Sequence, residues 1–405
     1  MLVGSSTCFE TRMKTVQKMK DRILFVCQRY GEEVNGGAEA ECRMYAEHLN
    51  ENYDVDVLTT CALDYVTWEN YYPEGVTQLN GVRVIRFPVN KRRQTKQFDE
   101  ISSKIVTPHT DEEELLWLES QGPFSPDCID YLKKNGKSYH SVLFMTYLYY
   151  TTAMGILEDL NNVILIPTAH DEWPIYLRHY RKVFGASDRI IYNADGEKRF
   201  VEKLYPEVAL KPSVTVGIGI NIPQGAIPDV KDWLNIEAPY LCYCGRIDES
   251  KGCRNLFQFF SMYKKRKKNE LKLVLTGKAV MSIPEEEGII SLGFVSEEKK
   301  LSVLKDSVAF VLASEYESLS IVVLESMMMG RPVLVNGRCE VLRDHCVNSN
   351  AGLYFTDYYE FEAALDWLFS HPDEYEIMRK NGKNYVEKNY RWETIIQKII
   401  SLIEQ

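Results

Sequence analysis

The sequence has no long apolar runs and no cysteine pair with the spacing of a zinc site, and its first residues do not show the pattern expected of a secretory leader. No window approaches the roughly 18 uncharged apolar residues of a transmembrane helix. Residues 1–20 are rich in Ser, Thr, Lys and Met and contain no apolar leader core, so they are expected to form a loose tail. The ten cysteines never show the C-x-x-C spacing of a zinc site. Reduced thiols are therefore expected, in a cytoplasmic protein whose membrane contact is at most peripheral.

Several familiar catalytic motifs are also missing. The first predicted strand is not followed by G-x-G-x-x-G, and the chain contains no G-x-x-x-x-G-K-[ST], H-E-x-x-H or G-x-S-x-G. These absences count against dinucleotide-dependent hydride transfer, P-loop hydrolysis, zinc proteolysis and α/β-hydrolase chemistry. The net charge of −10 counts against a nucleic-acid partner, which calls for a basic protein or a basic face.

What the sequence does contain is a repeated alternation of strands and helices. Short apolar runs suit buried parallel strands, and amphipathic segments between them suit helices. Helices are predicted over residues 38–50, 255–268, 296–305 and 321–329. Strands are predicted over residues 22–28, 53–59, 81–87, 141–146, 163–168, 189–193, 240–244, 272–276, 308–312 and 332–336. The pattern predicts an α/β protein with parallel sheets.

A seam rich in proline and glycine, over residues 206–228, divides this alternation into two Rossmann-like domains in series. The first is expected over residues 21–212, with an insertion at about 90–140, and the second over residues 213–385. A last helix, within 386–405, should cross back to the first domain. Ligands of open parallel sheets bind beyond the carboxyl ends of the strands, so the cleft between the domains is the expected substrate site.

The strongest motif is a pair of glutamates eight positions apart, Glu317 and Glu325, after the strand predicted over 308–312. The backbone N–H groups of Ser318, Leu319 and Ser320 are expected to open the next helix, where they can bind an anion or a hydroxyl. Eight residues make about 2.2 helical turns, so both carboxylates should face one way. Taken alone, the motif also fits two solvated glutamates at a helix start.

Two cations follow the strand predicted over 240–244. Arg246, directly after Gly245, carries a planar guanidinium group that can donate two parallel hydrogen bonds, and Lys251 carries a compact ammonium charge. Together they can neutralise a diphosphate. A solvated surface pair is the alternative interpretation.

Two further loops lie at strand ends. Gly36 and Gly37 open the first helix, where glycine lets a ligand approach the backbone closely. His170 follows the strand predicted over 163–168 and should face the cleft. A simple turn and a structural histidine are the alternatives for these two loops.

Together, these motifs resemble the retaining nucleotide-sugar glycosyltransferases of the GT-B fold, family 4, also called glycosyl transferases group 1. The resemblance extends over nearly the whole chain. It rests on Asn35–Glu39, His170–Asp171, Gly245–Arg246 with Lys251–Gly252, and Glu317-x7-Glu325 with Gly330-x-Pro332.

The resemblance implies two Rossmann-like domains facing across a cleft, and transfer of a sugar from a nucleotide-diphosphate sugar with retention at the anomeric carbon. It implies a glycan or lipid-linked acceptor in cell-surface polysaccharide synthesis, no cofactor and no divalent metal. The catalytic positions it implies are His170, Glu317, Arg246 and Lys251. The donor-binding positions it implies are Gly36, Gly37, Gly245, Arg246, Lys251, Glu317, Ser318, Leu319, Ser320 and Glu325, with Glu325 on the ribose.

Some positions depart from the family's pattern. Ser318 and Ser320 stand where the family usually has glycine, and Asn221 stands where aspartate is common. A nucleotide-sugar epimerase, a phosphorylase on the same scaffold and a non-catalytic sugar-nucleotide-binding subunit remain alternative interpretations.

Two clusters of cations stand out on this acidic chain. Lys91, Arg92, Arg93 and Lys96 lie near the expected acceptor side and predict peripheral binding to an anionic membrane. The cluster over residues 264–268 fits a solvated helix end.

Overall fold

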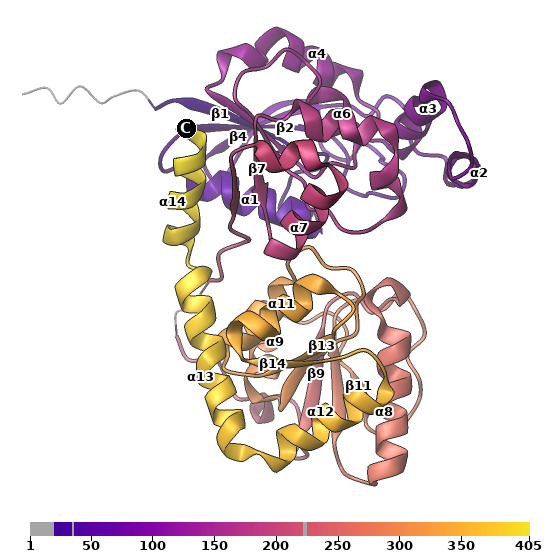
Figure 1. The fold of residues 1–405 in the computed structure, drawn as a ribbon, viewed down its shortest axis with the longest axis vertical. Coiled ribbons are helices and arrows are strands. Elements are labelled where there is room, and N and C mark those ends of the chain that lie inside the picture. Colours follow the sequence, from indigo (N-terminus) through magenta and orange to yellow (C-terminus); the bar gives the residue numbers. More distant parts are fainter. Residues whose placement is uncertain (1–19, 35, 222–224) are drawn as a thin grey trace, which may run out of the picture.

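The computed structural model describes residues 20–34, 36–221 and 225–405, which form two α/β domains (Figure 1). The tail expected over residues 1–20 lies outside the described residues except for Lys20. The nine described cysteines are buried free thiols. Among the described helices, none is both long and apolar enough to cross a bilayer.

The first domain is built on one sheet with strand order β3-β4-β2-β1-β5-β6-β7-β8. Its pairs are parallel apart from β3, which runs antiparallel to β4 at the edge. The central strands are apolar on both faces, as expected for a sheet covered by helices on each side. The strands are β1 (Arg22–Val26), β2 (Asp54–Thr60), β3 (Gly75–Leu79), β4 (Val82–Phe87), β5 (Ser141–Met145), β6 (Val163–Ile166), β7 (Arg189–Tyr192) and β8 (Ser213–Thr215).

The second domain is built on a parallel sheet with the order β11-β10-β9-β12-β13-β14. Together the two sheets confirm the predicted fold class. Sequence reasoning missed β3, β8, β11 and β14, which are edge strands with little apolar patterning. The strands are β9 (Tyr240–Cys244), β10 (Lys272–Thr276), β11 (Ile289–Ser291), β12 (Ala309–Leu312), β13 (Val333–Asn336) and β14 (Gly352–Phe355).

Helices cover both faces of each sheet (Figure 1). They are α1 (Gly37–Leu49), α5 (Tyr150–Gly155), α6 (Arg178–Ala186), α7 (Asp195–Leu204), α8 (Cys253–Lys267), α9 (Glu297–Asp306), α10 (Ile321–Met328), α11 (Glu340–Ser349), α12 (Tyr358–Ser370) and α13 (Pro372–Asn389).

The insertion expected at about 90–140 consists of three helices: α2 (Thr95–Ile105), α3 (Asp111–Gln121) and α4 (Pro126–Asn135). Helices α2 and α3 project from the side of the first domain (Figure 1).

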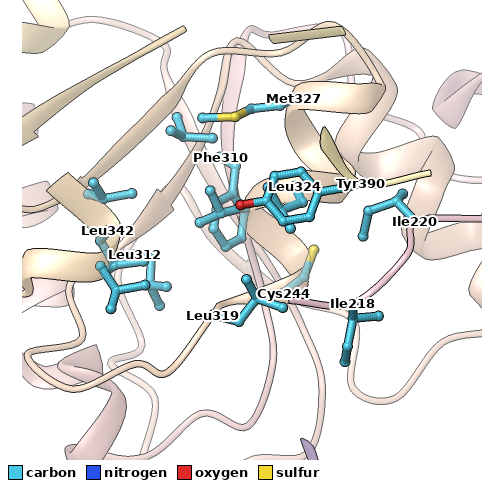
Figure 2. Close-up of a cluster of buried hydrophobic side chains, with 14 of the residues drawn as sticks. Ile218, Ile220, Cys244, Phe310, Leu312, Leu319, Leu324, Met327, Leu342 and Tyr390 are labelled. Carbon is cyan, nitrogen blue, oxygen red and sulfur yellow. The ribbon is translucent and has the colours of Figure 1, made fainter. Parts of the chain in front are cut away.

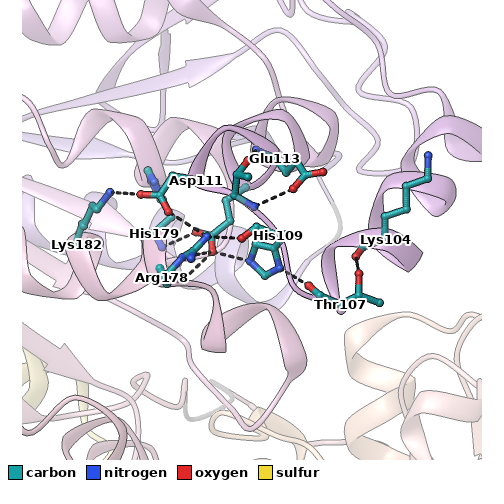
Figure 3. Close-up of polar contacts among 10 residues, drawn as sticks. Lys104, Thr107, His109, Asp111, Glu113, Arg178, His179 and Lys182 are labelled. Atoms are coloured by element: carbon teal, nitrogen blue, oxygen red, sulfur yellow. Dashed lines mark hydrogen bonds and ion pairs between the residues drawn. The ribbon is translucent and has the colours of Figure 1, made fainter.

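The start of α3 is tied to α6 by charged groups. The Glu114 carboxylate accepts the backbone N–H groups of His179 at 2.8 Å and Arg178 at 3.1 Å. Asp111 contacts Arg178 and Lys182 (Figure 3). The insertion is therefore tied to the domain at the start of α3.

Strand β8 pairs with β7 through register contacts such as Ile191 with Val214. The first sheet therefore continues past the boundary predicted at 212/213, because parallel pairing carries the chain one strand further before it leaves the domain.

The last helix, α14 (Trp392–Ile403), crosses back and packs on α1, as predicted. The Trp392 ring stacks on His48 with ring centres 3.9 Å apart, and its Nε1–H donates to Asn221 at 2.9 Å. Gly219 is required beside it, because a Cβ there would come within 2.3 Å of the indole. The two chain segments that connect the domains therefore lie side by side, and the Ile220 N–H donates to the Tyr390 carbonyl at 2.8 Å.

Candidate functional site

The loops that follow β1, β6, β9 and β12 meet in a cavity of about 540 Å³ between the domains. These loops converge because the carboxyl ends of the two parallel sheets face one another. Eight of the predicted site residues line this cavity: Gly37, His170, Gly245, Lys251, Glu317, Ser318, Leu319 and Ser320. Gly36, Arg246 and Glu325 do not line it.

The charged centre of the cavity is an ion pair. Lys251 Nζ lies 2.7 Å from Glu317 Oε1; the Glu317 side chain is 11% exposed and the Lys251 side chain 33%. Gly252 allows this approach: its φ of 69° favours glycine, and a Cβ there would lie 2.1 Å from the Ala313 carbonyl oxygen. The Lys251 loop therefore lies directly against the end of β12.

Arg246 lies outside the cavity lining, with 43% of its side chain exposed. Its Nε lies 2.7 Å from Asp248 Oδ2. Its Nη1 donates to the Tyr65 hydroxyl of the first domain at 3.1 Å. The predicted diphosphate cation therefore has partners in both domains.

Gly36 shapes the start of α1 from behind the cavity. A Cβ at Gly36 would lie 2.0 Å from a carboxylate oxygen of Glu39. That buried carboxylate accepts hydrogen bonds from Gln28 and from Arg29 Nε, both at 2.9 Å. The absence of a side chain at Gly36 thus lets Glu39 reach these partners, while Gly37 faces the cavity.

The structure corrects the geometry predicted for the two-glutamate motif. Helix α10 begins only at Ile321, and Ser320 before it adopts a left-handed conformation with φ 64° and ψ 77°. Glu317 lies on the loop before this helix and Glu325 within it, so the count of helical turns between them does not apply. The N–H groups of the first helical turn belong to the residues after Ser320, and those of Ser318–Ser320 lie on the preceding loop.

Glu325 lies in a second cavity, of about 660 Å³, lined also by Met44, Ile218 and Lys300. Lys300 Nζ lies 2.9 and 2.8 Å from the two carboxylate oxygens of Glu325. Burial raises the pKa of the Glu325 carboxyl, and the Lys300 ammonium offsets part of that increase. No spacing in the sequence indicated Lys300, which lies 25 residues earlier on α9.

His170 has a carboxylate neighbour. Its Nε2 lies 3.4 Å from Glu172 Oε2, and Tyr147 donates its hydroxyl to Glu172 Oε1 at 2.6 Å. The Tyr147–Glu172 pair can orient the imidazole toward the cavity.

Sequence reasoning missed two buried carboxyls at the site. Glu41, on α1, lines the main cavity and accepts from Asn193 Nδ2 at 3.0 Å. Glu197 accepts the N–H groups of Ala169 at 2.5 Å and Asn193 at 2.6 Å. Burial raises the pKa of each carboxyl to about 8. Only the tertiary structure brings them together, because they lie 156 positions apart in the chain.

In the part of the chain that the structure describes, no three His, Cys, Asp or Glu side chains are grouped so that they can hold a metal ion.

Comparisons with known proteins relate the chain to glycosyltransferases in sequence and in fold. The sequence model of glycosyl transferases group 1 matches residues 231–385. An uncharacterized glycosyltransferase of Methanocaldococcus jannaschii is 26% identical over 174 residues, which cover 40% of this chain and 44% of that protein. The chain thus spans less than half the length of the curated relatives it matches.

Solved structures resemble the chain over almost all of its length. Sucrose-phosphate synthase from Thermosynechococcus elongatus superposes with a TM-score of 0.70 at 17% identity, covering 95% of this chain and 99% of that one. Anabaena HepE in complex with UDP and glucose gives 0.67 at 13% identity, with the same coverage. The chain therefore has the two-domain GT-B fold, and its second domain matches the model of glycosyl transferases group 1, in agreement with the family resemblance of its motifs.

Proposed function

We propose that this protein is a glycosyltransferase that moves a sugar from a nucleotide-diphosphate sugar to an acceptor with retention at the anomeric carbon. The observation that carries the proposal is the meeting of Lys251, Glu317, His170 and Gly37 in one cavity between the domains. The family match of the second domain and the UDP in a structural neighbour support a nucleotide sugar as donor.

In this proposal the donor extends through the two cavities. Glu325, held by Lys300, accepts the ribose hydroxyls in the larger cavity. Lys251 and Arg246 neutralise the diphosphate, and the start of α10 adds its helix dipole. Glu317 and the Ser318–Ser320 backbone bind the sugar.

The proposed chemistry depends on stabilising the departing nucleoside diphosphate. Fixed cations and N–H dipoles directed at developing charge are usually the largest single contribution to such a step. Lys251 can leave Glu317 for the diphosphate as charge develops there, which frees the carboxylate to accept from a sugar hydroxyl. We propose attack on the same face, with the leaving phosphate accepting the acceptor's proton and His170 beside the sugar. No metal is required in this scheme.

We propose a glycan or lipid-linked glycan as acceptor, with the first domain resting on an anionic membrane at its cytoplasmic face. The projecting α2–α3 segment supports this, because Val106, Leu115 and Leu116 expose 63%, 40% and 44% of their surface. Exposed Lys91 precedes α2, and exposed Lys96 lies in its first turn.

The structure changes the composition of the basic patch predicted there. Arg93 turns inward, where its Nε donates to the Gln121 carbonyl at 3.2 Å and its guanidinium lies over the Trp68 and Phe98 rings. Arg92 is exposed but pairs with Glu69 at 2.9 Å. Three cations therefore remain at the surface, and Arg93 is not available to lipid.

A ligand panel tests the donor. Thermal shifts are measured with UDP, GDP and ADP and with UDP-glucose, GDP-mannose and ADP-glucose, each with and without EDTA. One nucleotide pair should raise the melting temperature, and transfer to a glycan acceptor should persist in EDTA. If none of these compounds binds, the proposal is wrong. Turnover that required inorganic phosphate in place of an acceptor would instead indicate a phosphorylase.

A further inference from the structure

His345, on α11, contacts the loop proposed to bind the sugar from inside the second domain. The side chain is only 3% exposed. Its Nε2 lies 2.9 Å from the Leu319 carbonyl oxygen, and its Nδ1 lies 3.2 Å from the Tyr385 hydroxyl. A carbonyl only accepts, so Nε2 carries the proton, and Nδ1 accepts from Tyr385. Burial lowers the pKa of the imidazole, which agrees with this neutral form.

The Leu319 carbonyl lies next to a residue with an unfavourable backbone conformation. The next residue, Ser320, has a positive φ of 64°, which is costly for a residue with a side chain. Such a conformation persists only when its surroundings hold it in place. The Leu319 side chain is 3% exposed and lies among apolar residues that include Ile218 and Cys244 (Figure 2). His345 therefore binds the backbone carbonyl of Leu319, whose side chain is already held by apolar contacts.

The second bond of His345 leads toward the connections between the domains. The Tyr385 hydroxyl lies 3.3 Å from the Tyr390 hydroxyl, and the Tyr390 carbonyl accepts from the Ile220 N–H. On the other side of Leu319, a Cβ at Gly217 would lie only 3.0 Å from Leu319 Cδ1. The Ser318–Ser320 loop and both segments that connect the domains are thus linked by contacts around His345.

We propose that His345 is a positioning residue for the donor sugar. Its Nε2–H fixes the Leu319 carbonyl and with it the orientation of the Ser318–Ser320 backbone. This proposal rests on the proposed function, because it assumes that the sugar binds at this loop. The nucleoside diphosphate is proposed to bind mainly through the side chains of Glu325, Arg246 and Lys251 and not through the Leu319 backbone, so its affinity should depend on His345 much less than that of the nucleotide sugar.

The test compares two dissociation constants in each variant, one for the nucleoside diphosphate and one for its nucleotide sugar. The ligands are UDP with UDP-glucose, GDP with GDP-mannose, or ADP with ADP-glucose, whichever pair binds the wild type. In His345→Leu the dissociation constant of the nucleotide sugar should rise about tenfold, and that of the diphosphate should change less than twofold. His345→Gln keeps a terminal N–H donor and should restore sugar binding. His371→Leu, a matched change at the distant start of α13, should leave both constants unchanged.

If the leucine variant does not fold, His345→Asn replaces it, since a shorter amide can bond to Tyr385 but does not reach Leu319. The asparagine variant should then bind the nucleotide sugar more weakly, with little change in its affinity for the diphosphate. The glutamine variant should not show this weakening. Equal changes for sugar and diphosphate, or equal behaviour of the glutamine and asparagine variants, would overturn the role of His345. Failure of the wild type to bind any pair would overturn the proposed function itself.

Discussion

Lys251 Nζ lies 2.7 Å from Glu317 Oε1, so the cation predicted for the diphosphate touches the carboxylate predicted for the sugar. The two residues come from loops after β9 and β12, 66 positions apart. Each neutralises the other while no anionic ligand is bound. We expect a diphosphate to compete with Glu317 for the ammonium group, which links binding of the two halves of the donor.

Removing either cation should reduce turnover more than stability. Lys251→Ala and Arg246→Ala should each lower kcat by about 10²–10³-fold, the usual cost of losing one charge-stabilising donor. Steady-state kinetics and thermal unfolding are measured together. Arg254→Ala is the matched control, because Arg254 is an exposed cation of the same domain whose ion pair is with exposed Glu249. A variant that lost stability while its folded fraction kept full activity would mark the cation as structural.

Glu325→Gln should weaken binding of the donor and of the free nucleoside diphosphate alike, because the ribose hydroxyls lose a charged acceptor. Hydrogen bonds to charged groups contribute about 1.5–3 kcal/mol, so the dissociation constants should rise roughly 10–100-fold by titration calorimetry. Glu270→Gln, at an exposed position of the same domain, serves as the control. Unchanged affinity for both ligands would contradict the ribose assignment.

Ser320→Gly should raise the free energy of unfolding by about 0.5–1 kcal/mol. The left-handed conformation of Ser320 costs more in a residue with a Cβ, and glycine's greater unfolded-state entropy offsets only part of the gain. Ser318→Gly is the control, since it places glycine on the same loop at a residue without a positive φ. Denaturant titration compares the two. Equal losses of stability in both variants would show that Ser320 is not strained.

Glu41→Gln should change the pH dependence of stability. The pKa of the Glu41 carboxyl is about 8 in the folded protein and about 4.5 when unfolded. The folded state therefore binds more protons between these values, and wild-type stability falls as pH rises from about 4.5 to 8. Glutamine does not titrate, so the variant should gain about 2–4 kcal/mol relative to wild type across this range.

Denaturation at pH 5 and pH 8 measures the effect, with exposed Glu51→Gln as control. A difference between variant and wild type that stays constant with pH would mean that Glu41 is ionised in the folded protein.

Membrane binding should depend on the surface cations of the first domain. Replacing Lys91, Arg92 and Lys96 with glutamine should reduce flotation with anionic liposomes at low salt, at about 1 kcal/mol per cation. Replacing Lys265, Arg266 and Lys268 with glutamine removes the same number of exposed cations from the other domain and provides the control. Equal recovery with neutral and anionic liposomes would contradict the proposal.

The sequence alone determined much of this protein. The apolar runs over 240–244 and 272–276 coincide with β9 and β10, because strands buried on both faces leave an unbroken apolar signal. The loops that carry His170, Lys251 and Glu317 were identified because chemistry in parallel sheets concentrates at strand ends. Edge strands such as β8 gave no such signal, and so the domain boundary was placed too early.

Only the tertiary structure decided how these residues meet. Local sequence does not show that Lys300 pairs with Glu325, that Arg93 turns inward, or that α10 begins after a left-handed Ser320. These features depend on contacts between segments that are distant in the chain. The periodicity of apolar residues shows which face of a helix or strand is buried. The burial and the charge of a site depend on which helices and strands pack around it. Those neighbours are in place only once both sheets and the returning helix α14 have assembled.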